Sequence, residues 1–333
     1  MGRLRLLCLT MWLLCAVAPY ADAQADSLPD TPGAAAPDDM EEVVVSGERK
    51  GPRMWRISKG EHVLWLLGTP GVLPKGVTWD AQDVEAVLQE SQLVLSDVRV
   101  EATPGVISLI SLYRQYRRTI RLPDQQTLRD WLTPELYQRY HVLKQRYAPK
   151  EDWDDFRPLY VAQQLWRRAR EQQGMQERVD VQRAVLKLAK QHRVKTQELE
   201  INVEKPAKTA HGVLDELAEI PREREVACFD ATLTTLQDDV DVLKARADAW
   251  ALGDVARLRQ LQTGERQACW QALQSAPSVQ QLNRQSSEYW YRNAVQALQA
   301  HASTLALRSM NQLLGEQDVL ARFRADGYQV EGP

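Results

Sequence analysis

The first patterned stretch of the chain contains two short runs rich in apolar and aromatic residues, as strands often are. Two such runs, 54–58 and 62–67, flank Lys59-Gly60-Glu61, a sequence typical of a hairpin turn. An amphipathic helix is expected over 81–90 and a third strand over 92–98. This order of elements predicts a mixed sheet that is covered by helices.

The centre of the chain follows the helical period instead. Ala162, Leu165 and Ala169 fall at helical spacing, as they would on the buried face of a helix. Most of the stretch after residue 212 also has this pattern, and it predicts helices over much of 213–250, 253–274 and 278–300. A long helical insertion is therefore expected over about 105–300.

Strand patterns return in the middle and near the end of the chain. They cover 196–201, 304–308 and 328–330, with a helix predicted over 317–325. The fold class that follows is mixed α/β, with a mixed central sheet built from N- and C-terminal segments and a long helical region between them.

The first 23 residues have the layout of a secretory signal peptide. Arg3 and Arg5 precede a short apolar core, and Ala21-Asp22-Ala23 supplies the small residues of a cleavage site. No later apolar stretch is long enough to span a bilayer, so no membrane span is expected after cleavage. A periplasmic or secreted protein is predicted.

A spacer over 24–52 follows the signal, and a single domain is predicted over 53–333. The spacer is rich in Ala, Asp and Pro, but residues 41–47 form a β-prone island of three valines beside two glutamates. Such a segment could add a strand to the edge of a partner's sheet. An envelope interaction protein that works through 41–47 is therefore one functional hypothesis.

The net charge of the chain gives it little attraction to polyanions. The 333 residues have a formal net charge of −3, and removal of the signal takes away two Arg and one Asp, which leaves −4. This mild acidity argues against a nucleic-acid partner.

Of four cysteines, Cys228 and Cys269 lie outside the signal. In an oxidising compartment they could form a disulfide, and two buried thiols are the alternative.

Two similar motifs follow apolar strand runs near opposite ends of the chain. The first starts at Gly68 and runs to Gly76, and the second runs from Ser309 to Gly315. Each layout could present a metal ligand at a strand end, yet no histidine or carboxylate occupies the expected position. The pattern suggests an enzyme scaffold that has lost its usual metal chemistry.

The chain resembles TraB/GumN-like proteins, which are relatives of the Tiki proteases. The resemblance covers about 53–331. It depends on Trp55-Arg56-Ile57-Ser58, the run from Leu64 to Gly76, and the C-terminal Leu313-Leu314-Gly315-Glu316-Gln317-Asp318-Val319-Leu320 and Gly327-Tyr328-Gln329-Val330. It implies a metal-dependent hydrolytic site built from two Gly-x-x-His motifs and an acidic strand residue.

This sequence departs from that implied site at each key position. The first motif maps to Gly68 through Gly71, so that Gly71 replaces the expected histidine, and the second maps to Ser309 through Gln312, so that Gln312 replaces the other. The acidic position maps to Ser96, with Asp97 adjacent. Because a strand alternates its faces, a shift by one residue turns the carboxylate to the opposite face. Neither a metal nor another cofactor is expected.

Four residues are candidates for a remnant polar pocket: Asp97, Glu200, Arg292 and Asn293. Strand-end hydrogen bonds and salt bridges are the alternative roles for the two acids, and helix-to-sheet packing is the alternative for Arg292. The main interpretation is a catalytically inactive binding protein whose partner is an envelope protein, a peptide or a glycan-related component. The rival is a hydrolase with a remodelled metal site around Asp97, Glu200 and Arg292.

Overall fold

The computed structural model describes residues 51–333 except 71–72, 74–77, 173–179, 239–240, 262–263 and 315–318. The predicted signal peptide, all but the last two residues of the spacer, and Gly71 lie outside the described residues. The part of the chain that is described has the expected mixed α/β fold. None of its helices is both long enough and apolar enough to cross a membrane.

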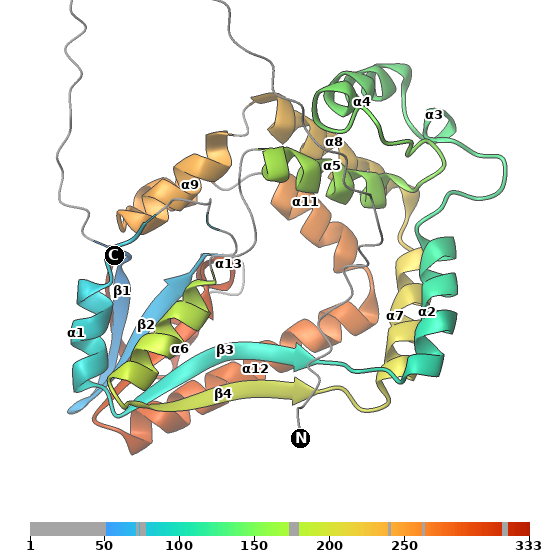
Figure 1. Ribbon diagram of the computed structural model, residues 1–333. Coiled ribbons are helices and arrows are strands. Elements are labelled where there is room, and N and C mark those ends of the chain that lie inside the picture. The colour runs from blue at the N-terminus through green and yellow to red at the C-terminus, as the bar shows by residue number, and fades with distance from the viewer. Residues whose placement is uncertain are drawn as a thin grey trace, which may run out of the picture. The chain divides into compact units, whose positions relative to one another are not determined.

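One six-stranded sheet contains every strand of the described residues (Figure 1). Its strands are β1 (Met54–Lys59), β2 (His62–Thr69), β3 (Leu93–Glu101), β4 (Lys195–Asn202), β5 (Ser303–Ser309) and β6 (Gln329–Glu331). Their order is β4-β3-β5-β2-β1-β6. The β2, β3, β4 and β5 strands are parallel to their neighbours among these four, whereas β1 pairs antiparallel with β2 and β6.

The β1–β2 hairpin forms where the sequence predicts it. Gly60 lies in the turn with φ of +62°, a left-handed conformation that glycine adopts without steric cost. The predicted strands differ from the observed ones by at most a few residues at either end. Short apolar runs and the turn residues between them were therefore sufficient to locate this hairpin.

Helices make up most of the remaining described chain. They are α1 (Gln82–Glu90), α2 (Val106–Thr119), α3 (Leu128–Trp131), α4 (Pro134–Tyr147), α5 (Pro158–Gln172), α6 (Val181–Gln191), α7 (Pro206–Ala218), α8 (Arg222–Asp238), α9 (Asp241–Ala251), α10 (Val255–Gln260), α11 (Gly264–Leu273), α12 (Pro277–Ala300), α13 (Met310–Leu313) and α14 (Val319–Ala325).

The helical region predicted over much of 213–250 contains the end of α7 and all of α8 and α9. Pro221 accounts for the break between α7 and α8, because proline has no backbone N–H and its ring clashes with the preceding turn. The chain leaves α7 after Ala218, and the Pro221 carbonyl then accepts hydrogen bonds from the first turn of α8.

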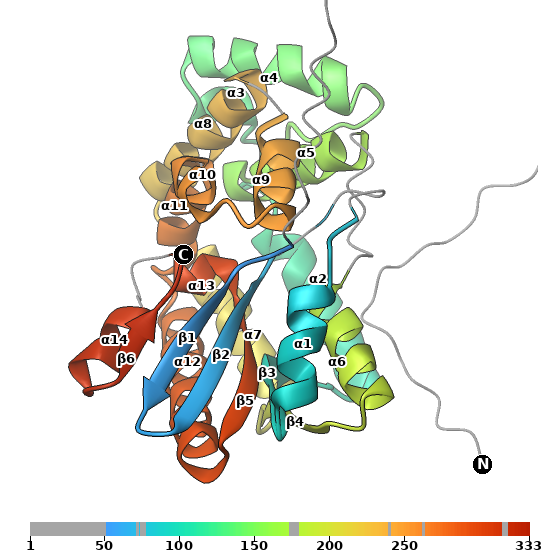
Figure 2. The same cartoon turned by 90° about the vertical axis from the view of Figure 1, so that its left-hand side faces the viewer.

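Helices cover both faces of the sheet. Figure 2 shows α1 and α6 on one face and α12 on the other. The central strands are buried on both faces, as Leu64 and Leu66 of β2 and Leu305 and Leu307 of β5 are 0% exposed. We call this group, together with Trp290 of α12, the sheet core.

A second hydrophobic cluster lies among α3, α4, α5, α8 and α11. Its fully buried members include Leu128, Tyr140, Leu165, Phe229 and Leu233, and we call it the helical core. Helices α2 and α7, which follow β3 and β4, pack against each other on the way to it. The chain thus builds two separate apolar clusters in its described residues.

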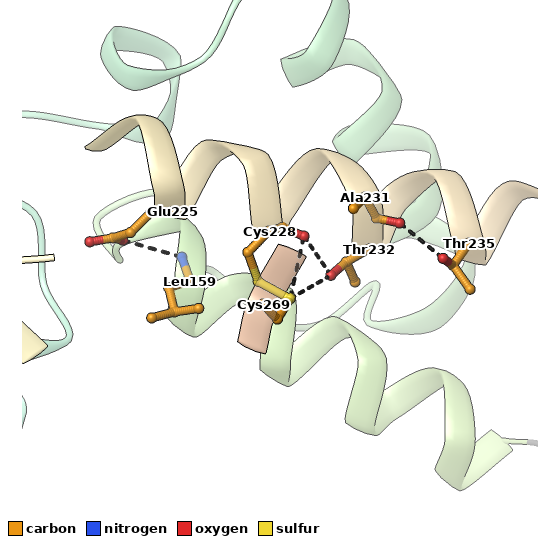
Figure 3. Close-up of a disulfide and its surroundings, with 7 residues drawn as sticks. All are labelled: Leu159, Glu225, Cys228, Ala231, Thr232, Thr235 and Cys269. Atoms are coloured by element: carbon orange, nitrogen blue, oxygen red, sulfur yellow. Dashed lines mark hydrogen bonds between the residues drawn. A yellow bond between two sulfur atoms is a disulfide. The ribbon is translucent and has the colours of Figure 1, made fainter. Parts of the chain in front are cut away.

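A disulfide joins two helices of the helical core (Figure 3). Cys228 of α8 and Cys269 of α11 have Cα atoms 4.4 Å apart. The hydroxyl of Thr232, one turn after Cys228, donates to the Cys228 carbonyl at 2.8 Å. The disulfide expected from the cysteine count is therefore present in the structure, and it closes a loop of 41 residues.

Candidate functional site

The two motifs with missing histidines meet at the carboxyl edge of the parallel strands. The β2–β5 register places Gly68 opposite Arg308 and Thr69 opposite Ser309. Ligands commonly bind at this edge of parallel strands, because loops and helix starts converge there. The fold therefore brings the two degenerate motifs side by side, although they are about 240 residues apart in the chain.

Gly68 is tightly enclosed by its neighbours. Its carbonyl accepts a hydrogen bond from the indole of Trp250 at 2.7 Å. A Cβ atom at this position would lie 2.5 Å from the Met310 methyl and 3.0 Å from Leu313 Cδ1. A larger residue would require the ends of the Met310 and Leu313 side chains to shift, so close packing against α13 favours glycine here.

The second motif begins at the end of β5. The short helix α13 starts directly after Ser309, and Gln312 lies within it at the position of the expected histidine. The Gln312 amide oxygen is buried and has no hydrogen-bond partner among the described residues. A buried carbonyl that lacks a hydrogen-bond donor lowers the stability of the fold by about 1–3 kcal/mol. The hydrogen bonding of Gln312 is therefore incomplete.

A bulge in β3 determines where Asp97 points. The β3–β4 register shifts between Leu95 and Val98. Ser96 stabilises the bulge, since its hydroxyl accepts from the Leu199 N–H at 2.8 Å and donates to the Asp97 carbonyl at 2.7 Å. Bulges commonly redirect a neighbouring side chain. Here the bulge directs the Asp97 carboxylate toward β5, while Ser96 has a local structural contact.

Both carboxylate oxygens of Asp97 are occupied. Oδ1 accepts from the Arg308 guanidinium at 2.6 Å and from the Val98 N–H at 2.7 Å, and Oδ2 accepts from the Ser309 N–H at 2.8 Å. The Arg308 side chain is only 3% exposed and lies over the Trp290 ring, 5.0 Å from its centroid. The pair connects β3 to the end of β5.

The site does not fit the metal that the family resemblance implies. Metal sites need several convergent His, Cys or carboxylate ligands, and the described residues contain no group of three or more such side chains close enough to hold an ion. Asp97, the acid beside the two motifs, faces the permanent positive charge of Arg308. A guanidinium therefore takes the place next to the carboxylate that a cation would need.

The other candidate residues have separate contacts. Glu200 is exposed and lies 3.6 Å from Arg99, not beside Asp97. Asn293 links α12 to β4 by accepting from the Gln197 amide at 2.9 Å, and donates to a carbonyl of its own helix. Arg292 is exposed and lines a cleft next to the degenerate site.

This cleft has a volume of about 930 Å³ and contains residues from several parts of the fold. Arg308 and Gln312 form its side nearest the sheet. Its other lining residues come from β4, α12 and α14: Ile201, Arg284, Gln285, Ser287, Glu288, Tyr289, Tyr291, Arg292, Val319 and Arg322. With four arginines and one acid in this set, the degenerate site opens into a basic cleft rather than a packed surface.

Glu288 and Arg322 are held together in the cleft. The Arg322 guanidinium donates to both Glu288 oxygens, at 2.7 and 3.2 Å, and this pairing lowers the pKa of Glu288 and raises that of Arg322. The same guanidinium covers the Tyr291 ring, 3.7 Å from its centroid. Burial, followed by donation to Asp326, raises the Tyr291 pKa, so its hydroxyl stays neutral.

Sequence reasoning missed Arg308 as the partner of Asp97. The available signal was a charged residue at the end of the otherwise apolar run Thr304-Leu305-Ala306-Leu307, directly before the second motif. A charge that a strand buries requires a counter-charge. Pairing this arginine with the acid at the end of the third predicted strand would have identified the contact.

Comparison with known proteins gives one match. The model of the TraB/PrgY/gumN family matches residues 53–332, which is most of the chain. No curated protein and no solved structure matches.

Proposed function

The chain belongs to the TraB/PrgY/gumN family, and from this premise we propose that it is a catalytically inactive member that acts by binding a partner in the periplasm or outside the cell. The proposal depends on one observation above all. The Asp97 carboxylate accepts hydrogen bonds from Arg308 and from two backbone N–H groups. Metal-dependent hydrolysis needs a cation that polarises the substrate or activates water, and these contacts make Asp97 unavailable as a ligand for it.

The second motif supports the same interpretation. Gln312 offers a neutral amide where imidazole would be needed, and Ser309 contributes a backbone N–H to Asp97 rather than a ligand. An amide oxygen is a poor ligand for the metals that imidazole and carboxylate bind. The scaffold of the site has been kept, whereas the residues that would make it a hydrolase have been replaced.

Localisation rests on the N-terminal sequence and on the disulfide. A signal-like segment over 1–23 and a Cys228–Cys269 pair both fit an oxidising compartment outside the cytoplasm. The partner would then be an envelope protein, a peptide or a glycan-related component. The rival hydrolase with a remodelled site receives less support, because Asp97 and Glu200 pair with different arginines.

The test is metal content measured together with peptide cleavage. Mature protein is purified, its metals are quantified, and it is incubated with a peptide library and added Mn²⁺, Co²⁺ or Zn²⁺. We expect substoichiometric metal and no turnover. Stoichiometric metal with turnover that Asp97→Asn abolishes would refute the proposal.

A matched control separates true turnover from contamination. Glu171→Gln changes an exposed acid of α5 whose partners are Arg167 and Arg168, so it leaves the Asp97 contacts intact. Cleavage that persists unchanged in both variants comes from a contaminating protease. Cleavage that is lost only in Asp97→Asn comes from this site.

A further inference from the structure

We infer that the cleft beside the degenerate site binds an acidic peptide segment that carries apolar side chains. This inference rests on the proposed binding function and specifies its ligand. The sign of the charge is the first argument. The lining contains the four arginines Arg284, Arg292, Arg308 and Arg322 and the single acid Glu288. A cleft lined by one sign of charge concentrates ligands of the opposite sign.

Two of these arginines, Arg284 and Arg292, form no salt bridge in the described residues, although Arg292 is close enough to lower the pKa of Glu288. Arg308 is paired with Asp97, and Arg322 with Glu288. Arg284, by contrast, donates to the neutral amide of Gln280, and both Arg284 and Arg292 are exposed. Guanidinium groups of this kind are suited to carboxylates, which they can bind through two parallel hydrogen bonds. The available positive charge lies on the α12 side of the cleft.

Two buried polar atoms at the sheet side also lack partners. The Arg308 Nε–H has no acceptor and the Gln312 amide oxygen has no donor among the described residues. Both residues line the cleft, and Arg308 is 3% exposed. Native structures leave few such groups unsatisfied without a reason. A peptide unit carries the two groups that these atoms lack, one C=O acceptor and one N–H donor, and it reaches them once the side chains that cover them in the ligand-free cleft move aside.

The apolar part of the lining favours a peptide over a sugar acid. Ile201 and Val319 contribute aliphatic surface, and the Tyr291 face that could stack on a ring is already covered by Arg322. Sugar hydroxyls need many polar partners, whereas alternating acidic and apolar side chains need guanidinium groups and aliphatic contacts. The cleft offers four guanidinium groups and the aliphatic side chains of Ile201 and Val319, beside fewer neutral polar groups, such as those of Gln285 and Ser287.

Binding is tested on the mature protein with a fluorescein-labelled peptide of alternating Glu and Val residues. Fluorescence anisotropy should show saturable binding that weakens as NaCl is raised, since the charges are solvent-accessible. The double variant Arg284→Ala/Arg292→Ala should weaken binding by about tenfold or more. Arg114→Ala removes an exposed arginine of α2 outside the cleft and should leave affinity unchanged.

A second variant tests the sheet side of the cleft. Gln312→Met keeps the length of the side chain but removes the acceptor for a backbone N–H, and it should weaken binding by about fivefold to tenfold. Circular dichroism and thermal unfolding show that each variant is folded. Loss of binding in Gln312→Met without loss of folding supports a direct contact.

Three outcomes would overturn the inference: no binding of the Glu/Val peptide, equal binding of its Lys/Val counterpart, or preferential binding of oligogalacturonate, a sugar acid. Mass spectrometry of the recovered probe separates this inference from the proposed function. An intact probe that binds supports both. A bound probe that is cleaved supports the acidic-peptide assignment and refutes the inactive-site proposal. If the protein holds no stoichiometric metal, cleaves no peptide and does not bind the probe, only the acidic-peptide assignment is refuted.

Discussion

Two buried arginines, one beside each hydrophobic cluster, pair with a carboxylate and complete their hydrogen bonds in different ways. In the helical core, Arg157 donates to Glu225 and to the carbonyls of Ala218 and Ile220, and Glu225 also accepts from the Leu159 N–H. Beside the sheet core, Arg308 pairs with Asp97, but its Nε–H has no acceptor among the described residues. The two pairs thus differ in hydrogen bonding: the helical pair is complete, whereas the sheet pair, which lies beside the cleft, has an unpartnered N–H.

The two pairs also differ in the exposed fraction of their carboxylate side chains. The Glu225 side chain is 1% exposed and that of Asp97 is 19% exposed. Burial raises the pKa of Glu225, even though Arg157 and the Leu159 N–H lower it. The helical pair is thus a closed structural contact, while the carboxylate of the sheet pair retains access to solvent.

The largest expected effect comes from breaking each pair with a substitution of similar volume. Arg157→Met leaves the Glu225 carboxylate buried without its counter-charge, and it should lower the free energy of unfolding by about 3–5 kcal/mol. Arg308→Met should cost less, because Asp97 retains two backbone donors and partial exposure. Urea denaturation measures both.

Arg168→Ala serves as the control for this comparison. Arg168 and Glu151 form a pair whose side chains are 38% and 35% exposed. Removal of this pair should change stability by no more than about 1 kcal/mol. If Arg308→Met proves as costly as Arg157→Met, the distinction between a closed and an incomplete pair does not hold.

The next effect concerns the disulfide, which belongs to the helical core alone. Replacement of Cys228 and Cys269 by alanine should lower stability by about 2–4 kcal/mol, since a closed loop of this length restricts the unfolded chain. Hydrogen exchange should show faster opening of α8 and α11, while β2 and β5 keep their protection. Equal loss of protection in the sheet would show that the two clusters unfold as one unit.

Stability should also depend on pH through Glu225. Its pKa is raised in the folded protein, so the folded state binds more protons than the unfolded state between about pH 4.5 and the raised pKa. This contribution is fully present below about pH 4.5 and is lost as pH rises through the folded pKa. A pKa difference of one corresponds to about 1.4 kcal/mol.

Glu225→Gln isolates this contribution. The amide keeps the size of the side chain and one acceptor but does not titrate, so the pH-dependent loss should disappear from its unfolding curves. Subtraction of the variant's free energy of unfolding from that of the wild type at each pH gives the Glu225 contribution. A difference that grows in favour of the wild type as pH rises toward about 4.5, and then stays constant above it, would mean that folding lowers the Glu225 pKa instead of raising it.

The smallest effect on stability is expected at Gln312, which lines the cleft beside the Arg308–Asp97 pair. Gln312→Met removes a buried oxygen that has no donor among the described residues, and it should raise the free energy of unfolding by about 1 kcal/mol. Thermal unfolding without ligand measures it. Gln237→Met, on α8, is the control, because the Gln237 amide accepts from Arg139 at 3.0 Å at an exposed position. Destabilisation by Gln312→Met would show that its oxygen has an effective partner.

The sheet could be located from sequence because its signals are local. The apolar runs within 54–67 and the apolar run before Ser309 specify strands without knowledge of their neighbours. The helical centre could be recognised in the same way, but the points at which one helix ends and the next begins were less clear from periodicity alone. The fold was therefore predictable where neighbouring residues favour the same secondary structure.

The chemistry of the site was harder to predict from the sequence, because it depends on contacts between distant segments. The missing histidines were visible in the sequence, but the contact between Asp97 and Arg308 joins residues 211 positions apart. A bulge between Leu95 and Val98 also changes the face to which Asp97 points, and strand periodicity alone does not place bulges. Pairing of charges across the sheet requires the strand order, which the local pattern does not contain.

The position of β5 has a consequence for biosynthesis. This strand lies between β3 and β2 in the sheet, yet residues 303–309 are synthesised after both of these neighbours and after the whole helical core. Until they emerge from the ribosome, β2 and β3 have no strand between them. The helices over 128–273 can meanwhile associate through more local contacts. A nascent chain stalled before residue 303 should therefore expose sheet-forming edges to chaperones.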